Sequence, residues 1–412
     1  MGKIHTKKLI PQCIFTVLLF LMCLESLTDI PLLQKLLKHL DELIVLGCLV
    51  YLVLHIHYVL RKKWRLLYLW LGFMAIGTVS SLVYGYQKLI PSIIDAVVVI
   101  SKFMVGYLTA YVYSSLHHDP LAPRLTFSAR AITVLLFAIS VHDILFSPIF
   151  PKGDFRYFTN SLILMFPHQT YLSAAMVTLL ILLGYTNKNN NNIPFMLMAT
   201  FVGIMTLRGK AIAFFAVYWM MYLCLVVFRV RNYGLLILIG GLGCVVIGFE
   251  QISDYFLTTT RFSPRQIMLK DSIPLALSHF PLGTGFGTFG STIAAQYYSP
   301  IYTQLNYPAL RGMGPTETMF LTDNFWPEII AQFGLIGAIL FILIVFCFVF
   351  DSIKVLRKHV CAGFSMLIIL INILINSTAE SSFFNPTSFL LFALLGLFEA
   401  ENALQRLPLH KE

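Results

Sequence analysis

The sequence predicts an all-α protein that crosses a membrane many times. Of its 412 residues, 58% are hydrophobic and only 12% are charged, whereas soluble domains carry roughly 25% charged residues. The apolar residues are gathered in runs of about 20, the length at which an α-helix crosses a bilayer. This composition excludes a soluble globular, a disordered or a fibrous protein.

We expect about twelve transmembrane helices, because polar or turn-forming residues separate one apolar run from the next. The first run follows Lys3, Lys7 and Lys8 as a signal peptide would, but no small-residue cleavage site comes after it, so we expect a retained helix. The expected helices lie near residues 9–27, 43–60, 66–86, 92–114, 131–150, 169–185, 193–207, 211–228, 234–250, 327–350, 360–378 and 388–404.

The basic residues predict that both ends of the chain are cytoplasmic. With the N-terminus inside, most of the 29 Lys and Arg fall in inner segments, as the positive-inside rule requires. The net charge of +10 is therefore explained mainly by topology. No basic stripe interleaved with aromatic residues is visible, so we expect no nucleic-acid partner.

Residues 251–326 break the even spacing of the apolar runs. Their aromatic and apolar content argues against disorder, and Ile267–Leu277 is expected to form a short amphipathic helix. We expect a folded cap on the outer face of the membrane, between helices 9 and 10. The chain would then divide into helices 1–9 (1–250), the cap (251–326), and helices 10–12 with a cytoplasmic tail (327–412).

Basic residues on the outer side are candidates for binding an anionic group. Guanidinium groups match phosphate oxygens bidentately and stay charged beside a bilayer. The alternative is that they reach to the membrane interface or form loop salt bridges. Arg208 is the strongest candidate, because the tight hairpin Thr206–Lys210 leaves almost no room for a solvated loop. The candidate anion-binding residues are Arg208, Arg265, Arg261, Lys210 and Arg311.

Three residues expected at the outer face are candidates for a general base: Asp323, His168 and Glu380. A buried carboxyl with a raised pKa is suited to accept a proton from a hydroxyl. Against this, Asp323 and Asn324 are ordinary N-cap residues for the helix that follows, and a lone histidine is more often structural.

Two further patterns have structural and functional readings. The glycine-rich run 281–290 lacks the βαβ context of a dinucleotide site, so we favour a tight loop over an amide nest for phosphate. Charged residues within expected spans, such as Asp95, Lys102 and Asp143, are functional sites or structural pairs between helices. No metal-binding motif stands out, so we expect metal-independent chemistry without a cofactor.

In their order along residues 160–400, several motifs resemble those of the O-antigen polymerase and ligase superfamily of bacterial envelope glycosyltransferases. Arg265, which precedes the glycine-rich run, adds to the resemblance. The motifs are Phe166-Pro167-His168-Gln169-Thr170-Tyr171-Leu172, Leu207-Arg208-Gly209, Pro281-Leu282-Gly283-Thr284-Gly285-Phe286-Gly287, Asp323-Asn324 and Gly334-Leu335-Ile336-Gly337.

The resemblance implies a GT-C-like fold of about twelve helices with a large periplasmic loop, and a glycan substrate carried on undecaprenyl diphosphate. By this resemblance, Arg208 and Arg265 hold the diphosphate, and a residue at the start of the late helix activates the acceptor hydroxyl. Ligases have His-Asn where this chain has Asp323-Asn324. That departure weakens a ligase assignment.

We therefore expect a metal-independent glycosyltransferase of the bacterial inner membrane, with its active site on the periplasmic face. It would polymerise an O-antigen or surface polysaccharide by moving the growing glycan onto the next lipid-linked repeat unit. Its partners would be the lipid-linked oligosaccharide and polysaccharide, membrane lipids and a chain-length regulator. The alternatives are a ligase that transfers the glycan to lipid A core and, from another class, a polysaccharide or lipid transporter or flippase.

Overall fold

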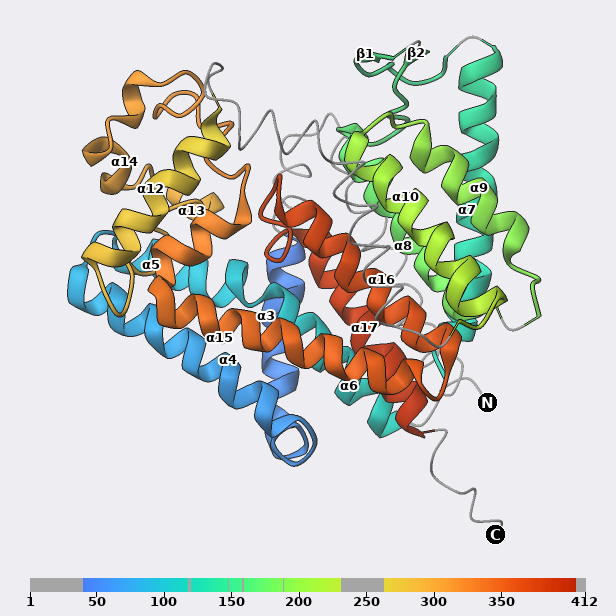
Figure 1. Ribbon diagram of the computed structural model, residues 1–412, viewed down its shortest axis with the longest axis horizontal. Helices are drawn as coiled ribbons and strands as arrows, with labels where there is room; N and C mark the ends of the chain where they lie inside the picture. The colour runs from blue at the N-terminus through green and yellow to red at the C-terminus, as the bar shows by residue number, and fades with distance from the viewer. Residues whose placement is uncertain are drawn as a thin grey trace.

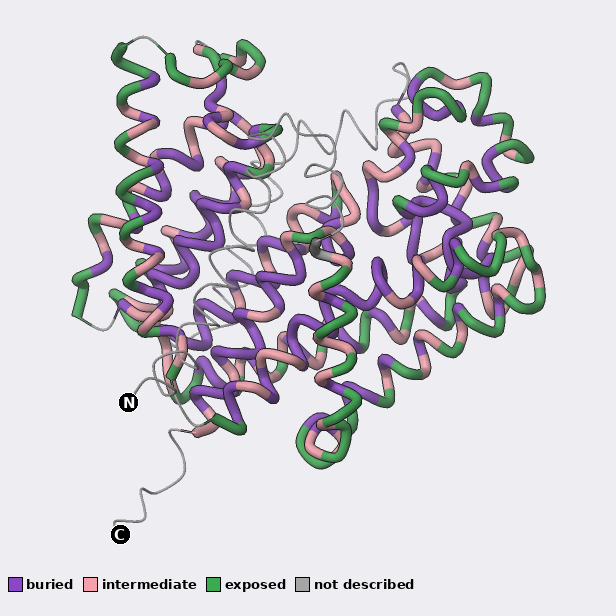
Figure 2. The backbone as a smooth tube through the Cα atoms, turned by 180° about the vertical axis from the view of Figure 1, so that it is seen from behind, coloured by how far each residue is buried: buried purple, intermediate pink, exposed green. Residues whose placement is uncertain are grey.

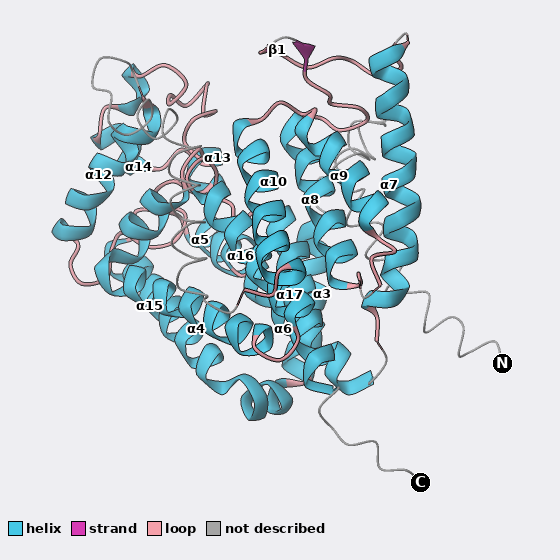
Figure 3. Ribbon diagram, turned by 45° about the vertical axis from the view of Figure 1, so that its right-hand side comes forward, coloured by secondary structure: helices cyan, strands magenta, loops and turns pink. Residues whose placement is uncertain are grey.

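The computed structural model of the protein describes residues 40–117, 120–146, 148–157, 159–187, 189–230 and 263–404. Over these residues the chain is almost entirely helical (Figure 3). The exception is a short antiparallel hairpin, in which β1 (Phe155–Arg156) pairs with β2 (Thr159–Asn160). The expected spans at 9–27 and 234–250 lie outside the described residues.

The first part of the chain forms a series of helices up to residue 227. They are α3 (Leu40–Leu54), α4 (Ile56–Tyr84), α5 (Leu89–Ile94), the π-helical η1 (Asp95–Ile100), α6 (Lys102–His117), α7 (Ala122–Leu145), α8 (Gln169–Tyr185), α9 (Ile193–Ile204), α10 (Gly209–Tyr222) and the π-helical η2 (Leu223–Val227).

The second part begins with short helices and ends with three long ones. In order they are α12 (Pro264–Ser278), α13 (Thr292–Gln296), α14 (Pro300–Gln304), the 3-10 turn η4 (Tyr307–Ala309), α15 (Phe325–Leu356), α16 (Val360–Ser377) and α17 (Pro386–Leu404). The amphipathic helix expected at Ile267–Leu277 corresponds to α12.

Six described helices are long and apolar enough to cross a membrane. The segments Leu89–Ile100 and Lys102–His117, which meet at 46°, make a seventh if they count as one span. The helices α3, α8 and α9 are apolar but shorter. The chain is therefore an all-α, multi-pass membrane protein, and the count of about twelve spans stays a prediction. The six are Ile56–Tyr84, Ala122–Leu145, Gly209–Val227, Phe325–Leu356, Val360–Ser377 and Pro386–Leu404.

Exposed stretches run along α4 and α15 (Figure 2), and many of their exposed residues are large and hydrophobic. Tyr68 and Leu82 of α4 are 59% and 74% exposed, and Phe346 of α15 is 64% exposed. A soluble protein avoids contiguous apolar surface of this kind. Lipid is the solvent in which such faces are stable.

The expected spans 43–60 and 66–86 meet at a kink within α4. Lys63, between the two ranges, has the non-helical φ and ψ of −129° and 27°. Lys63 is only 9% exposed and forms ion pairs with Asp351 and Glu399. The sequence did not predict that Lys63 is buried at this break, because its carboxylate partners lie far along the chain.

The helices are arranged in three groups in Figure 1, with α7 to α10 on one side and α4 and α15 on the other. Between them, α6 and α17 pack along each other, with α3 and α16 beside them. A Cβ on Gly396 would lie 2.2 Å from Tyr107 O, and one on Gly106 would lie 2.5 Å from Phe389 O. Glycine at these two positions therefore allows the close approach of the two helices, as is common between membrane helices.

Residues 263–324, which we call the lobe, form a folded unit with an apolar cluster of its own (Figure 1). Phe289, Tyr302 and Tyr307 are fully buried in this cluster. The lobe and the β1–β2 hairpin lie at the same end of the helix bundle (Figures 1 and 3). This end is where the sequence predicted the functional residues.

The glycine-rich run of the lobe is docked on a break in α15. At the break, Gly334 has φ 61° and ψ −169°, which interrupts the helix. The interruption frees the carbonyl oxygens of Ala331 and Gln332, which accept hydrogen bonds from the amides of Thr284 and Gly285, each over 2.9 Å. A helix break and a glycine turn therefore satisfy each other's backbone groups.

Candidate functional site

Most of the candidate residues converge where several helices begin. His168 and Arg208 immediately precede α8 and α10, Arg265 lies in the first turn of α12, Asp323 precedes α15, and Glu380 follows α16. Since α8, α10, α12 and α15 all start at this end, the positive ends of four helix dipoles favour negative charge here. We call the ionisable side chains gathered there the charged cluster: Asp154, Arg156, His168, Arg208, Lys210, Arg265, Asp323 and Glu380.

Arg208 occupies a turn with no room for a loop. The preceding residue, Leu207, adopts a left-handed conformation with φ 52°, and Arg208 is the N-cap of α10. One guanidinium nitrogen, Nη2, donates to His168 Nε2 and to Gln169 Oε1, each over 2.6 Å, and lies 3.9 Å from Asp154 Oδ2. The side chain is 21% exposed. Arg208 is therefore held in place by the start of α8 while it remains open to solvent on one side.

His168 is neutral in this arrangement. Because a guanidinium can only donate, Nε2 accepts from Arg208, while Nδ1 lies 3.0 Å from Thr170 Oγ1 and 3.3 Å from the Thr170 amide nitrogen. Burial and the neighbouring Arg208 guanidinium lower the pKa of His168 below its usual 6.5. A proton on Nε2 would face the arginine, so His168 acts as an acceptor that orients Arg208.

Two further ion pairs lie in the charged cluster. Lys210 Nζ is 3.1 Å from Glu380 Oε1, with both side chains about a quarter exposed (22% and 28%). Arg265 donates through Nε to the carbonyl oxygen of Asp323 over 3.0 Å, and through Nη2 to its carboxylate over 3.2 Å. Arg265 Nη2 also reaches Ala379 O at 3.5 Å. The cations are thus placed by backbone and carboxylate acceptors rather than extended into solvent.

The ion pairs belong to one electrostatic unit. Desolvation raises the pKa of Asp323 above its usual 3.8, against the opposing influence of Arg265 and Lys210 and with a smaller contribution from Glu380. The Glu380 carboxylate also interacts with His168. With His168 neutral, the charged cluster holds four cations (Arg156, Arg208, Lys210 and Arg265) and three carboxylates (Asp154, Asp323 and Glu380). Counted over its described residues, the charged cluster therefore carries one excess positive charge at the helix starts.

Two predicted anion-binding residues are not part of this unit. Arg311 is exposed in the turn that follows η4, and among the described residues it has no ion-pair partner. The prediction for Arg261 falls on a residue outside the described ranges. Arg311 lies close in the sequence to the glycine-rich run, but this did not bring it to the charged cluster. The lobe folds around its own apolar core, and Arg311 lies on the outside of the lobe.

Sequence reasoning gave no role to Gln169 and Asp154. Gln169 is only 2% exposed; its Oε1 accepts from Arg208 and its Nε2 donates to Ser161 Oγ over 2.9 Å. The one available signal was its position inside the Pro167-His168-Gln169 motif. Asp154 lies before β1, where nothing in the local pattern relates it to Arg208.

The glycine-rich run packs against the helices and offers no nest of amides. Thr284 and Gly285 donate to carbonyl oxygens of α15, and the Gly287 amide donates to Asp95 Oδ2 over 2.7 Å and to Gln332 Oε1 over 3.1 Å. These amides are already bonded to protein acceptors. The structural reading of this run therefore fits better than phosphate binding.

The charges expected inside spans have structural partners. Asp95, fully buried on η1, accepts from Gly287 as above, and Asp143 accepts from the amide of Ile149 over 2.9 Å, which ties down the chain after α7. Across the described ranges, no group of three or more His, Cys, Asp or Glu is placed to hold a metal ion.

No protein-family model matches this chain, and a search of curated proteins found no match. The class that the fold defines is an all-α multi-pass membrane protein. The site adds cations, carboxylates and a neutral histidine at one end of its helices.

Proposed function

We propose that the protein is a polysaccharide polymerase of the bacterial inner membrane. It would transfer a growing glycan from undecaprenyl diphosphate to the sugar end of the next lipid-linked repeat unit, at the periplasmic face. The observation that carries this proposal is the charged cluster, in which Arg208, Lys210 and Arg265 lie among helix N-termini at the end of apolar helices.

The cations suit a diphosphate leaving group. When the glycosidic bond to the carrier breaks, negative charge develops on the diphosphate, and fixed guanidinium groups stabilise it where nucleotide-sugar enzymes use a metal. The contact between Arg208 and Asp154 is long, 3.9 Å, and Asp154 is 64% exposed. A phosphate oxygen can replace this carboxylate with little loss, because exposed ion pairs contribute little.

Asp323 is the best placed general base. Its pKa is raised toward neutral pH, which makes the carboxylate a stronger base. It therefore accepts a proton from a sugar hydroxyl more readily. His168 is less suited to this role, because its acceptor nitrogen is already bonded to Arg208. Glu380 is bonded to Lys210 through one oxygen and remains the second candidate.

The test is a polymerisation assay with purified protein and undecaprenyl-diphosphate-linked repeat units. Wild-type protein should produce glycans of increasing length, and Arg208→Ala and Arg265→Ala should each abolish polymer while expression and membrane insertion stay intact. Arg311→Ala is the matched control, since it removes an arginine from the lobe outside the charged cluster. Normal polymer in both cluster variants would refute the proposal.

Changing the acceptor separates polymerase from ligase. Growth of product with lipid-linked repeat units alone indicates a polymerase, whereas transfer only to lipid A core indicates the ligase alternative. Both outcomes are consistent with the proposed donor site. The second outcome changes only the acceptor, from a lipid-linked repeat unit to lipid A core.

One observation favours the transporter alternative. Asp95, on the bent span, and Glu328, on α15, are both fully buried and interact electrostatically with each other. Bent spans with buried charges are common in transporters. If Asp95→Asn and Glu328→Gln abolished translocation of lipid-linked glycan in vesicles, while Arg208→Ala had no effect, the transporter reading would replace ours.

A further inference from the structure

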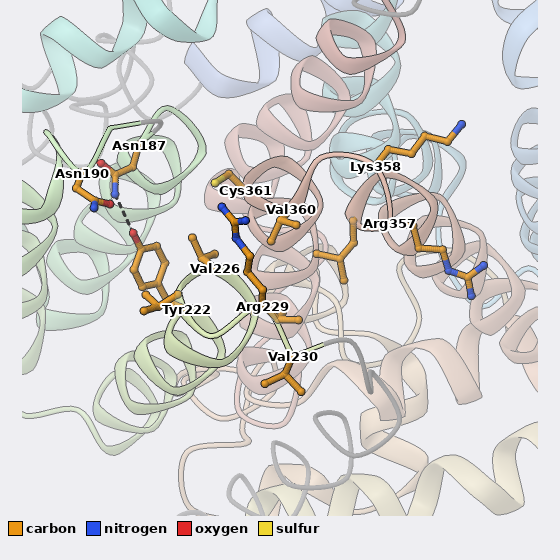
Figure 4. Close-up of a pocket in the computed structure, with 13 residues that line it drawn as sticks. Asn187, Asn190, Tyr222, Val226, Arg229, Val230, Arg357, Lys358, Val360 and Cys361 are labelled. Carbon is orange, nitrogen blue, oxygen red and sulfur yellow. Dashed lines mark hydrogen bonds between the residues drawn. The ribbon is translucent and has the colours of Figure 1, made fainter.

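A cavity of about 880 Å³ lies at the end of the helices opposite to the charged cluster (Figure 4). Its walls come from the end of η2, the junction between α15 and α16, and the turn between α8 and α9. The helices that lead there start or end at the charged cluster, since α10 begins after Arg208 and α16 ends before Glu380. With 18 residues in α16, the two ends are separated by roughly 27 Å.

This separation places the cavity at a membrane interface. The hydrocarbon core of a bilayer is about 30 Å thick, so a cavity one helix length from the charged cluster lies at the level of the lipid headgroups of the other leaflet. Its lining combines two chemistries. Leu225, Val226 and Val360 give it an apolar side, and Asn187, Asn190 and Tyr222 give it a polar one.

The charge of the lining is entirely positive. Arg229, Arg357 and Lys358 line the cavity, and no carboxylate does among the residues that the structure describes. In Figure 4 the Arg229 side chain extends between Val226 and Val360 toward Cys361, whereas the Arg357 and Lys358 side chains point away from Arg229. Among the described residues Arg229 has no ion-pair partner. Arg229 is therefore an exposed cation at the cavity, and no carboxylate of the described residues lies within ion-pair distance of it.

Arg229 has an unfavourable backbone conformation. Its φ is 51°, in the left-handed region that is unfavourable for a residue with a Cβ. The turn closes η2, with the Val230 amide donating to Cys224 O over 2.9 Å. Glycine is the usual residue for such a helix end. An arginine here loses stability that a glycine would keep, which favours a role for its side chain.

We propose that this cavity binds the phosphate headgroup of an anionic membrane phospholipid. Arg229 contacts the phosphate, Arg357 and Lys358 add positive charge at the edge of the cavity, and the acyl chains lie along the apolar side formed by η2 and α16. Basic pockets between helices at a membrane surface are the sites that take anionic headgroups. The inference is independent of the proposed glycosyltransferase activity.

The test compares lipid retention by the full-length protein in detergent micelles doped with phosphatidylglycerol or phosphatidylcholine, measured by native mass spectrometry and thermal unfolding. We expect phosphatidylglycerol to be retained preferentially and to raise the unfolding temperature. Arg229→Gly should weaken retention about tenfold, the equivalent of one lost charge-assisted contact. Because glycine fits the left-handed turn, this variant should unfold in phosphatidylcholine micelles no earlier than wild type.

Arg61→Ala is the matched control, because Arg61 is an exposed arginine that does not line the cavity. It lies near the same end of α15 as the cavity, since Lys63, two residues further on, pairs with Asp351. It should leave retention unchanged. Equal retention of the two lipids, wild-type retention by Arg229→Gly, or an equal loss in Arg61→Ala would overturn the proposal. A separate arm with glycerol 3-phosphate distinguishes the sources of phosphate. Protection by this soluble phosphate, with no preference for phosphatidylglycerol, would reject a lipid.

Discussion

Arg208 Nη2 donates to His168 Nε2 over 2.6 Å, which joins the first residues of α10 and α8. The two residues are forty positions apart in the sequence, yet each is the N-cap of its helix. In this contact the histidine Nε2 is the acceptor, and the direction of the arginine side chain is fixed by it. It also makes the position of Arg208 depend on the protonation of His168.

That dependence predicts a loss of stability in acid. The folded protein lowers the pKa of His168 below 6.5, so in the pH window between the lowered value and 6.5 the unfolded chain binds the proton more readily. Stability should therefore fall as the pH decreases through this window. His168→Gln, which cannot titrate, should show a shallower dependence of unfolding temperature on pH between about 7 and 5. An unchanged slope would show that His168 does not titrate differently on folding.

Asp323→Asn tests the general base. The amide keeps the size of the side chain but cannot accept the proton of a sugar hydroxyl, so the rate of polymer formation should fall by about 10²–10⁴-fold. In the wild type, activity should be lost as the pH falls through the raised pKa of Asp323, at a higher pH than for an ordinary carboxyl. Glu380→Gln is the comparison: if it alone abolishes activity and Asp323→Asn does not, Glu380 is the base.

Gly283→Ala should destabilise the protein. The new Cβ would lie 2.3 Å from Gly334 N, and the residue has a φ of 80°. We expect a loss of about 2 kcal/mol or more in the free energy of unfolding, from the backbone conformation and the clash together. Gly47→Ala is the matched control, with nothing within 4 Å of its Cβ on an exposed face of α3. It should be neutral or stabilise by about 0.5–1 kcal/mol, and equal losses for both would contradict the close packing.

Two lysines that share Asp351 should differ in their contribution to stability. Lys63 lies 3.2 Å from one oxygen of Asp351 and its side chain is 9% exposed, whereas Lys354 lies 3.3 Å from the other oxygen and is 55% exposed. Lys63→Met leaves Asp351 and Glu399 without their buried cation and should cost about 3–5 kcal/mol. Lys354→Met should cost about 1 kcal/mol or less. Unfolding in detergent measures both, and similar losses would argue against burial of the Lys63 pair.

Apolar helices could be predicted from the sequence because hydropathy is a local property. The expected range 169–185 coincides with α8 (Gln169–Tyr185), and 360–378 differs from α16 (Val360–Ser377) by one residue. The short hairpin that holds Arg208 and Lys210 was also predictable, since two apolar runs leave only a few residues between them. A polar residue between two spans lies near a membrane surface, however the helices pack against one another.

Tertiary structure alone decided which polar residues meet. It brought Glu380 to Lys210 and Gln169 to Arg208, left Arg311 exposed in the lobe, and drew Lys63 into the bundle. The glycine-rich run likewise acquired its partner only when α15 broke at Gly334. These contacts join residues far apart in the chain, and their geometry depends on how the helices cross. Apolar patterning therefore determined that the chain enters a membrane, while helix packing determined which charges lie close enough to act together.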